Sequence, residues 1–507
     1  MRRVIMRTAR GGSVHVRVLL VGAILCASPP LHLSAQSTDA DIARLVAALQ
    51  GDTPMLRDAQ VLTDIIGGRP TGSSANLRSI DWGLSRFQDA GVAADKEAFM
   101  MPALWLEHAA SAAIEGDGVR FSPRIASMPF SKGTLPGGFT ARLVDGGLGT
   151  DADIQRAGSL LRGAIVLIET AELKDVDGLF KEYADATEIE QRAIAAGVAG
   201  LIYVGSRPDN LLYRHNASLG PKNQLPMAVM ERDAGLKALR LLRVGAPLTI
   251  TLKIDVESGG EYESYNVLGQ IRGSVKPDEV IVIGAHLDSW DLGGGALDNG
   301  ANVAMVIDIA RQIKALGIKP SRTIRFALWN GEEQGMWGSW GYTRRHTPEL
   351  DRHVMTTSID IGTGRINGFF TGARPELLPA VDQALAPVSG MGPFTQVDVP
   401  IVGTDNFDFM LEGVANLVAN QDAANYGPNY HARSDEFARI DQPQLRRNAA
   451  IIAAMTLRFA EMPVTWTRQS RAQVERIFKT TDLEQQMRSM GNWDDWVSGK
   501  RGRLAKP

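Results

Sequence analysis

Residues 280–300, with the sequence VIVIGAHLDSWDLGGGALDNG, constrain the fold more than any other stretch of this chain. The run Val280–Ile283 is apolar and β-branched, which is typical of a strand buried on both faces. His286 follows where this strand gives way to a loop, and a glycine-rich turn then leads to Asp298. Apolar residues recur at helical spacing after Asn299, so a helix is expected to start there. A buried strand, a loop and a helix in this order predict an open α/β sheet, which binds ligands beyond the carboxyl ends of its strands.

Three more apolar runs, at residues 323–329, 355–359 and 414–418, also predict strands. Polar side chains of the kinds that bind metals follow these strands as well as the first one. The candidates are His286, Asp298, Glu332, Glu333, Asp360 and His431. Because the carboxyl ends of parallel strands meet in one crevice, we expect these side chains to lie close together. Imidazole and carboxylate groups are zinc ligands, and a set of this size could hold two metal ions about 3.5–4 Å apart.

The adjacent acids Glu332 and Glu333 could divide two tasks between them. Neighbouring residues in a turn point in different directions, so one carboxylate can bind metal while the other stays free. A free carboxylate beside a metal-bound water can act as a general base. Taken alone, such a pair is more often a solvated part of the surface. Asp288, two residues beyond His286, is a candidate to orient the imidazole ring of that histidine; its alternative is an acid on a surface loop.

The length of the chain, 507 residues, is too great for one simple domain and favours two. Between residues 115 and 254, short apolar strands alternate with glycine- and proline-rich turns and with helical segments, which predicts a separate α+β unit. The α/β domain then comprises residues 36–114 and 255–507. At the C-terminal end, the basic residues between Lys500 and Lys506 are expected to form a solvated tail.

The first 35 residues predict a secretory signal peptide. They contain five arginines and no acid, an apolar run over residues 18–27, and Ser34-Ala35 as a cleavage point before Gln36. A retained membrane anchor is the alternative. The single cysteine, Cys26, would leave with the signal, so the mature chain would have no disulfide and no thiolate zinc ligand.

Charge and hydropathy narrow the classes of partner. The formal net charge of the chain is −3, and without the five arginines of the signal it becomes −8. A mildly acidic protein argues against a nucleic-acid partner. No later segment is long and apolar enough to span a bilayer, so we expect no stable membrane insertion after signal removal. The predicted location is the periplasm or the extracellular space.

Five motifs in this order resemble those of the co-catalytic zinc aminopeptidases and glutamate carboxypeptidases. They are HLDSW (His286–Trp290), ALDNGAN (Ala296–Asn302), WNGEEQGMWGSWGY (Trp329–Tyr342), SIDIG (Ser358–Gly362) and NYHARSDEF (Asn429–Phe437). The resemblance covers nearly all of the chain after the predicted signal. It implies the zinc exopeptidase fold, an α/β fold with a mixed, mostly parallel sheet flanked by helices. It also identifies residues 115–254 as an inserted α+β protease-associated domain.

The resemblance implies a role for each candidate side chain. Two zinc ions would be bridged by Asp298, and Glu332 would be the general base. Tyr430 would hydrogen-bond the tetrahedral intermediate. The full set of matched metal ligands is His286, Asp298, Glu333, Asp360 and His431. The family's cis peptide bond is expected after Asp298, although Asn299 stands where many relatives carry a second acid.

The function predicted in this way is that of a secreted zinc-dependent exopeptidase. It would hydrolyse dipeptides, or the N-terminal residues of short peptides, through a metal-bound water activated by Glu332. A non-catalytic receptor-like relative and a glutaminyl-cyclase-type acyl transferase are the alternatives on the same fold, and the complete set of ligand positions favours the peptidase. The sequence leaves open the preferred side chain, the choice between dipeptidase and longer-peptide enzyme, and the oligomeric state, with a homodimer among the options.

Overall fold

The computed structural model describes residues 31–504, apart from the side chains of residues 31–37, 176, 177 and 180. Its first sheet has seven strands. In spatial order they are β1 (Ala93–Met101), β10 (Tyr262–Ile271), β12 (Arg322–Trp329), β11 (Lys276–His286), β13 (His353–Ser358), β15 (Asn416–Gln421) and β14 (Ile366–Phe370). The central strands β12, β11, β13 and β15 run parallel, whereas the pairings β1–β10, β10–β12 and β14–β15 are antiparallel. The mostly parallel sheet expected from the sequence is therefore more evenly mixed.

The parallel centre of this sheet is buried on both faces, as the run Val280–Ile283 predicts. Side chains alternate between the two faces of a strand. Ile281 and Ile283 accordingly pack into the large apolar cluster beneath the helices, while Val280 and Val282 pack against Trp329 and its aromatic neighbours on the opposite face. No side chain of this run is more than 3% exposed. Burial on both faces fixes the register of β11, and the register in turn fixes the position of His286 at the end of the strand.

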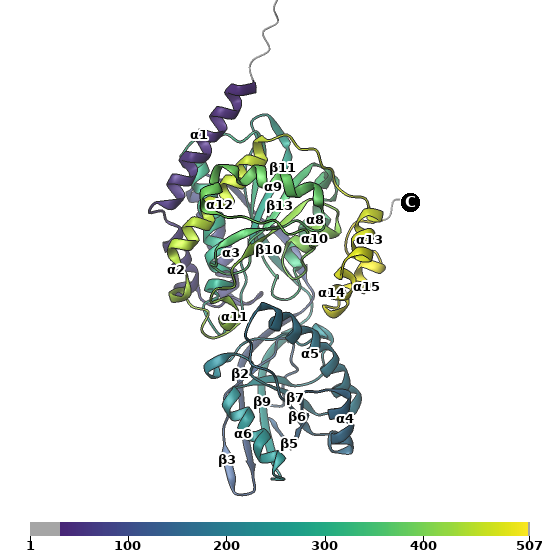
Figure 1. The fold of residues 1–507 in the computed structure, drawn as a ribbon. Coiled ribbons are helices and arrows are strands. Elements are labelled where there is room, and N and C mark those ends of the chain that lie inside the picture. Colours follow the sequence, from purple (N-terminus) through teal and green to yellow (C-terminus); the bar gives the residue numbers. More distant parts are fainter. Residues whose placement is uncertain (1–30, 505–507) are drawn as a thin grey trace, which may run out of the picture.

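Helices cover the seven-stranded sheet, and Figure 1 shows α1 and α12 side by side along one flank. The helices outside the second sheet's unit are α1 (Leu31–Gln50), α2 (Met55–Gln60), α3 (Ser74–Asp89), α7 (Ala301–Ala315), α8 (Trp337–Arg345), α9 (Leu378–Leu385), α10 (Asn406–Leu411), α11 (Tyr426–Asn429), α12 (Gln442–Glu461), α13 (Arg471–Thr480), α14 (Leu483–Ser489) and α15 (Trp493–Val497). Local sequence sets several of their starts. The Ser73 side chain accepts a hydrogen bond from the amide of Asn76, and the Asp441 side chain does so from Gln444, which caps α3 and α12.

A second sheet, of eight strands, lies in a separate body below the first in Figure 1. In spatial order its strands are β3 (Val119–Phe121), β2 (Leu104–Gly116), β9 (Thr249–Gly259), β5 (Phe139–Asp145), β6 (Ile165–Ile168), β7 (Gly200–Val204), β8 (Met227–Met230) and β4 (Ile125–Ser127). Its helices are α4 (Asp151–Ala157), α5 (Val176–Ala196) and α6 (Arg232–Arg243). The mixture of strands and helices agrees with the α+β texture read from the sequence, and its assignment as a protease-associated domain stays a prediction.

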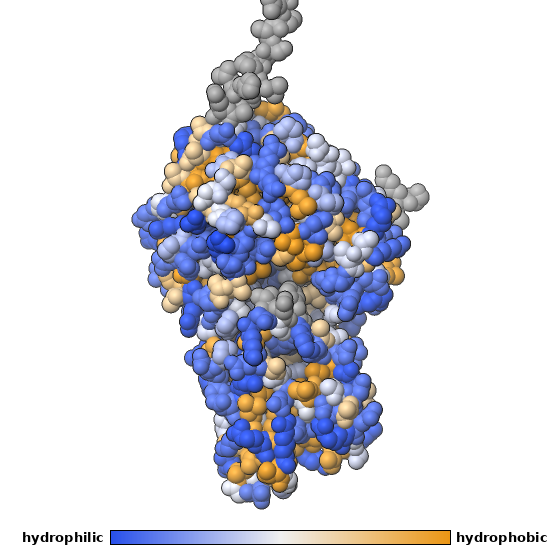
Figure 2. All heavy atoms as spheres, viewed as in Figure 1, coloured by the Kyte–Doolittle hydropathy of each residue, from blue (hydrophilic) through white to orange (hydrophobic). Residues whose placement is uncertain are grey.

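The second sheet is inserted at a hairpin of the first. Strands β1 and β10 are antiparallel neighbours, and Met101 pairs directly with Tyr262. All of the second sheet lies between these two residues in sequence, and we call residues 102–261 the insert. The long pair β2–β9 starts at the register Leu104 with Gly259, so this sheet extends beyond the predicted limits of 115 and 254. A narrow waist separates the two bodies in the space-filling view, where hydrophobic residues are scattered among hydrophilic ones (Figure 2).

Short helical turns connect the main elements. One of them moves the start of a predicted helix. The helix predicted from Asn299 begins at Ala301 as α7, after a π-helical turn over Ala296–Gly300. Asp298 and Asn299 have non-helical backbone angles in this turn, because the chain bends there to aim the aspartate inward. A second π-helical turn covers Val61–Ile66. The 3₁₀ turns are Gly158–Leu160, Pro208–Asn210, Gly220–Lys222, Thr347–Arg352, Pro375–Leu377, Ala386–Met391 and Phe437–Arg439.

The basic C-terminal end is not the solvated tail predicted from its charge. Arg501 is only 2% exposed, and its guanidinium forms a salt bridge with the buried carboxylate of Asp408. A pair of opposite charges can be buried where each satisfies the other, which a count of basic residues does not reveal. Arg501 therefore packs on the body of the seven-stranded sheet, whereas Lys500 and Leu504 are exposed.

The predicted signal peptide lies mostly outside the described residues. Helix α1 begins at Leu31, so the predicted cleavage point before Gln36 falls within its first two turns. Within residues 31–504, none of the helices has the length and apolar character needed to cross a membrane.

Candidate metal centre

The carboxyl ends of the four parallel strands bring the predicted ligands to one edge of the sheet. His286 is the last residue of β11, and Asp360 follows β13 by two residues. Glu332 and Glu333 lie in the loop after β12, and His431 lies in the loop after β15. The convergence predicted from the strand pattern is therefore present in the structure.

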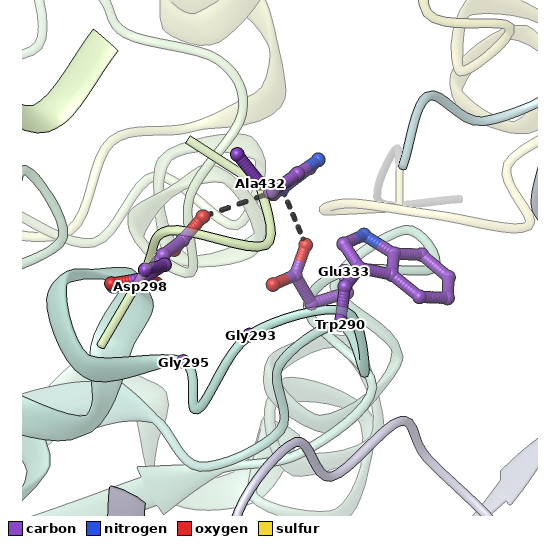
Figure 3. Close-up of a pocket in the computed structure, with 8 residues that line it drawn as sticks. Trp290, Gly293, Gly295, Asp298, Glu333 and Ala432 are labelled. Carbon is purple, nitrogen blue, oxygen red and sulfur yellow. Dashed lines mark hydrogen bonds and ion pairs between the residues drawn. The ribbon is translucent and has the colours of Figure 1, made fainter. Parts of the chain in front are cut away.

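Asp298 stands between the two histidines and contacts both. Its Oδ1 lies 3.1 Å from Nε2 of His286, and its Oδ2 lies 3.3 Å from Nε2 of His431. The same nitrogen of each histidine also contacts a second carboxylate, which is Asp360 at 2.9 Å for His286 and Glu333 at 2.7 Å for His431. Figure 3 shows Glu333 beside the ring of Trp290 and Asp298 on the opposite side of the pocket, with dashed lines for the two ion pairs that these carboxylates form with His431. All five side chains are buried.

These five residues form two groups of donors that could each hold a metal ion. The first group is His286, Asp298 and Asp360, and the second is Asp298, Glu333 and His431. Within each group the donor atoms lie within 4.8 Å of one another. We call them the His286 group and the His431 group, and they share Asp298. A small pocket opens beside the second group and is lined by Trp290, Gly293, Gly295, Asp298, Glu333, His431, Ala432 and Asp435.

Crowding of buried carboxylates around two imidazoles shifts the pKa of each group. Burial would raise the pKa of Asp298, but hydrogen bonds from His286 and His431 hold it below its usual range. Burial raises the pKa of Glu333 to about 7 against the attraction of His431. For His431, burial acts to lower the pKa, and Glu333 and Asp298 raise it to about 9. The carboxylates thus compete for positive partners in a dry site, which is the electrostatic condition that favours a bound cation.

Glu332 differs from its neighbour Glu333 in its surroundings. It is only half-buried, and its carboxylate belongs to neither donor group. Burial, and after it the negative charge of Asp360, raises the pKa of Glu332 well above its ordinary value, although His286 acts against this shift. Among residues 31–504, no donor hydrogen-bonds to this carboxylate. Its carboxylate therefore stays apart from both donor groups.

Asp288 supports the site in a different way from the one predicted. Nδ1 of His286 donates a hydrogen bond to the backbone carbonyl of Asp288 at 3.0 Å. The carboxylate of Asp288 lies 3.8 Å from the same nitrogen. The carboxylate instead accepts the amides of Glu332 and Glu333, each at 3.3 Å, and the hydroxyl of Thr71 at 3.0 Å. Asp288 therefore orients the histidine through its main chain and the glutamate loop through its side chain.

The turn that carries Asp298 is held by two further side chains. The peptide bond between Asp298 and Asn299 is cis, as the resemblance implies. The Asn299 amide donates to Oδ1 of Asp360 at 2.9 Å, so this position serves the site without being an acid. Asp435 accepts the amides of Leu297 at 2.6 Å and Asp298 at 3.1 Å, which fixes the backbone at the shared ligand.

The insert reaches into the centre through the segment 212–216. The backbone carbonyl of Arg214 accepts a hydrogen bond from Nδ1 of His431 at 3.2 Å, and its amide donates to the His431 carbonyl at 3.0 Å. The Asn216 side chain donates to the Glu333 carbonyl at 2.8 Å. A partner on the second ring nitrogen sets the orientation of a metal-binding histidine. The insert thus supports both non-shared members of the His431 group.

Tyr430 lies beside the centre with its ring stacked on His431, at 3.7 Å between ring centroids. Its hydroxyl hydrogen-bonds with Tyr183 of the insert helix α5. Burial, together with Tyr183 and the site carboxylates, raises the pKa of Tyr430 well above its ordinary value, so the hydroxyl keeps its proton. It is therefore a hydrogen-bond donor at the edge of the site.

Several supporting residues were not predicted from the sequence. The Arg69 guanidinium donates to the carbonyls of Leu287, Gly294 and Gly295 and so ties the glycine-rich turn to the end of β11. Arg69 stands within Gly67-Gly68-Arg69-Pro70, and an arginine among turn-forming residues is the one local signal that could have pointed to it. Asp435 stands within the quoted motif NYHARSDEF. Arg214 and Asn216 carry no local signal, because their partners are distant in sequence.

Comparison with known proteins relates the centre to a known family. A model of peptidase family M28 matches residues 266–456, a span that contains every member of both donor groups. Carboxypeptidase Q of Mus musculus is 28% identical over 418 residues, which cover 79% of this chain and 84% of that protein. Residues 266–456 are therefore similar to peptidase family M28, and most of the chain is similar to carboxypeptidase Q. The chain is a metallo-exopeptidase, in agreement with the resemblance read from the five motifs.

Two solved peptidase structures have the same fold. A peptidase M28 precursor from Shewanella amazonensis superposes with a TM-score of 0.76 and 26% identity, covering 86% of this chain and all of that chain. A zinc aminopeptidase from Bacillus subtilis superposes with a TM-score of 0.62 at 20% identity, over 79% of this chain and 93% of that one. The second likeness concerns the fold alone.

Proposed function

We propose that this protein is an exported two-zinc exopeptidase that hydrolyses dipeptides or removes N-terminal residues from short peptides. The observation that carries the proposal is the pair of donor groups sharing Asp298, with the free carboxylate of Glu332 beside them. The printed names of its relatives include aminopeptidases and carboxypeptidases, which supports an exopeptidase but leaves the direction of attack open.

The donor set fits zinc. It offers two imidazole nitrogens and three carboxylates, which are the ligand types of zinc sites in hydrolases. The buried Oε1 of Glu333 accepts no hydrogen bond from the described residues, and the buried Oδ2 of Asp298 has only the imidazole of His431 beside it, at 3.3 Å. Buried charged oxygens without a partner are costly, and a cation would satisfy them. Zinc bound there would act as a Lewis acid on the peptide carbonyl and would acidify a water molecule.

The chain's own residues supply the proton transfers. Glu332 would take a proton from the attacking water and deliver it to the leaving amine. Burial raises its pKa above the ordinary value, which makes the carboxylate a better proton acceptor than a free glutamate. The Asp288 carboxylate holds the amides of Glu332 and Glu333 and so keeps the two acids in their separate directions. The protonated hydroxyl of Tyr430 would donate to the oxygen of the tetrahedral intermediate.

Two variants of the adjacent glutamates test this mechanism. Glu332→Gln keeps the size of the side chain and removes its basicity. It should leave the metal content and the melting temperature nearly unchanged while kcat falls by at least ~10²-fold, the lower end of general-base effects. Glu333→Gln should instead release metal from the His431 group. Metal analysis and turnover of a dipeptide, measured on both variants, decide the assignment.

Each of the two variants serves as the control for the other. Loss of metal from Glu332→Gln together with full metal retention by Glu333→Gln would reverse the two roles. Peptide hydrolysis at the wild-type rate by both variants would exclude the mechanism. Comparing free dipeptides, N-blocked dipeptides and longer peptides on the wild-type enzyme would then define the substrate class.

Export is proposed from the first 35 residues and from the word precursor in the name of a related structure. A signal peptidase would cut after Ala35, and the mature chain would begin at Gln36. N-terminal sequencing of the protein recovered from the periplasm or the medium checks this. A mature protein that still contains residues before Val18 would contradict it.

A further inference from the structure

The loop that carries Glu332 and Glu333 has a backbone that needs external support. Gly331, Gly335 and Met336 all have left-handed conformations, with φ of 74°, 120° and 61°. Met336 is not glycine, so its conformation is strained and persists only where the surroundings hold it. The amides of Gly335 and Met336 both donate to the Glu332 carbonyl, which closes the loop on itself. From the side of β11, the Asp288 carboxylate holds the two glutamate amides, as described above.

The opposite side of this loop is held by Arg501, from the last described turn of the chain. Its Nη2 donates to the carbonyl of Gly335 at 3.3 Å. Its Nε and Nη2 also form a two-pronged salt bridge with Asp408, both at 2.7 Å, and both side chains are almost fully buried. Ser339 links the same parts, because its hydroxyl lies 3.3 Å from Asp408 and 3.1 Å from the Met336 carbonyl.

Apolar contacts join the loop to the C-terminal helices as well. Met336 belongs to an apolar cluster that contains none of the metal-centre residues. Most members of this cluster come from α10 and the segment 471–497. The members are Met336, Val402, Phe407, Met410, Leu411, Val474, Ile477, Phe478, Leu483, Met487 and Trp496. The guanidinium of Arg501 lies over the rings of Trp340 and Phe407, at 4.8 and 5.0 Å. The strained residue of the loop is thus packed by the same segment that delivers Arg501.

The C-terminal segment also contacts the insert. Figure 1 shows α14 beside α5, and the hydroxyl of Thr187 on α5 donates to the carbonyl of Ser489 at 3.2 Å. Arg471 anchors the end of the segment, because its guanidinium donates to the carbonyls of Arg503 and Trp496. The segment 471–504 is therefore fastened on both sides of the point at which Arg501 enters the core.

We propose that Arg501 is a positioning residue of the peptidase, which holds the loop 331–336 so that the Glu332 carboxylate keeps its catalytic place. The inference rests on the proposed role of Glu332. Arginine suits the task because its planar fork binds the Asp408 carboxylate with two nitrogens and still presents a hydrogen to the Gly335 carbonyl. Lysine keeps the charge but has a single nitrogen on a flexible chain, so it should not replace arginine here.

The test compares kcat and KM of Arg501→Met and Arg501→Lys with those of the wild-type enzyme loaded with zinc. We expect both variants to lose at least about tenfold in kcat, because displacement of a catalytic group by about 1 Å can cost 10²-fold. KM should change by less than about threefold, and the zinc content should stay the same, because Arg501 touches neither substrate nor metal ligands. Arg503→Met is the matched control, since Arg503 lies in the same turn and contacts the Gln469 carbonyl instead of the loop.

A second variant separates positioning from loss of the fold. Arg501→Met leaves the Asp408 charge buried without a partner, which can unfold a protein. The double variant Arg501→Met/Asp408→Leu removes both charges, and it should stay folded with the same low kcat. Wild-type kcat in a folded double variant would overturn the proposal.

A third comparison distinguishes this proposal from the proposed function itself. If Arg501 acts through Glu332, then Arg501→Met should lower turnover no further in the Glu332→Gln enzyme than Glu332→Gln does alone. Equal, additive losses in both backgrounds would show that Arg501 does not act through Glu332. If Glu332→Gln itself retains full kcat, the proposed mechanism fails, whatever the Arg501 variants do. If Glu332→Gln is inactive while the Arg501 variants have wild-type kcat, only the positioning role fails.

Discussion

The two donor groups that share Asp298 are held in place by different parts of the chain. In the His286 group, the histidine ring donates to the carbonyl of Asp288, and Asp360 accepts from Asn299. All of these partners lie on the seven-stranded sheet or on the loops at its edge. In the His431 group, the ring of His431 donates to the carbonyl of Arg214, and the main chain at Glu333 accepts from Asn216. Both of these partners belong to the insert.

This difference changes what the insert is expected to do. The sequence predicted this part of the chain only as a separate α+β unit. The structure instead gives it contacts with the main chain at Glu333 and with both the ring and the main chain of His431. Support from outside the ligand shell typically alters metal affinity by 10–100-fold. The insert therefore supports one donor group, and the other is complete without it.

Arg214 shows how firmly the two bodies are joined at this point. Its side chain is 1% exposed and forms salt bridges with Glu107 of the insert and Asp291 of the seven-stranded body, both at 2.8 Å. Burial acts against its charge, but Asp291 and then Glu107 raise the pKa of Arg214 above its usual range. The same residue supplies the carbonyl that orients His431. A buried charge with partners on both bodies keeps that carbonyl in a fixed place.

The largest expected effect comes from removing the insert. Met101 and Tyr262 are directly paired on β1 and β10, so a two-residue Asn-Gly turn can replace residues 102–261 and close the hairpin. We expect the shortened chain to keep metal in the His286 group and to lose affinity by at least about tenfold in the His431 group. Dipeptide hydrolysis should fall to the level of the Glu332→Gln enzyme. Metal analysis and a competition titration with a chelator measure the two affinities.

Native affinity at both groups in the shortened chain would remove the distinction between them. Loss of both metals in a folded chain would show that the insert supports the centre as a whole. The circular dichroism and melting curve of the metal-loaded chain establish whether the seven-stranded body has folded. If it has not folded, the two donor groups are compared instead in the Asn216→Ala variant described below.

The sequence predicted the ligands of both donor groups, and the reason is physical. Buried parallel strands leave long apolar runs, and the ligands stand at the ends of those runs. This is why His286, Glu333 and Asp360 could be placed at one edge of a sheet from pattern alone. The same reasoning reproduced the order of the main elements, and the resemblance supplied the shared role of Asp298.

The contacts that the sequence did not predict join residues far apart in the chain. The hydrogen bond between His431 and Arg214 spans 217 positions, and the salt bridge between Arg501 and Asp408 spans 93. Periodicity reports which face of an element is buried, but it does not report which distant side chain covers that face. The basic charge of the C-terminal end was misleading for the same reason. It predicted exposure to solvent, because the sequence does not show that Asp408 is the buried partner of Arg501.

The smallest expected effect tests the comparison with one side chain. Asn216→Ala removes the hydrogen bond to the Glu333 carbonyl and leaves the Arg214 contacts in place. The loop at Glu333 then gains freedom, so we expect zinc affinity in the His431 group to fall by about tenfold, the lower end of the range for supporting residues. The affinity of the His286 group should stay the same. Asn223→Ala is the matched control, because that asparagine also belongs to the insert but donates only to the carbonyls of Phe130 and Leu225. A chelator titration that weakens both groups equally in Asn216→Ala, or that gives the same curve for both variants, would show that the insert does not act selectively on one group.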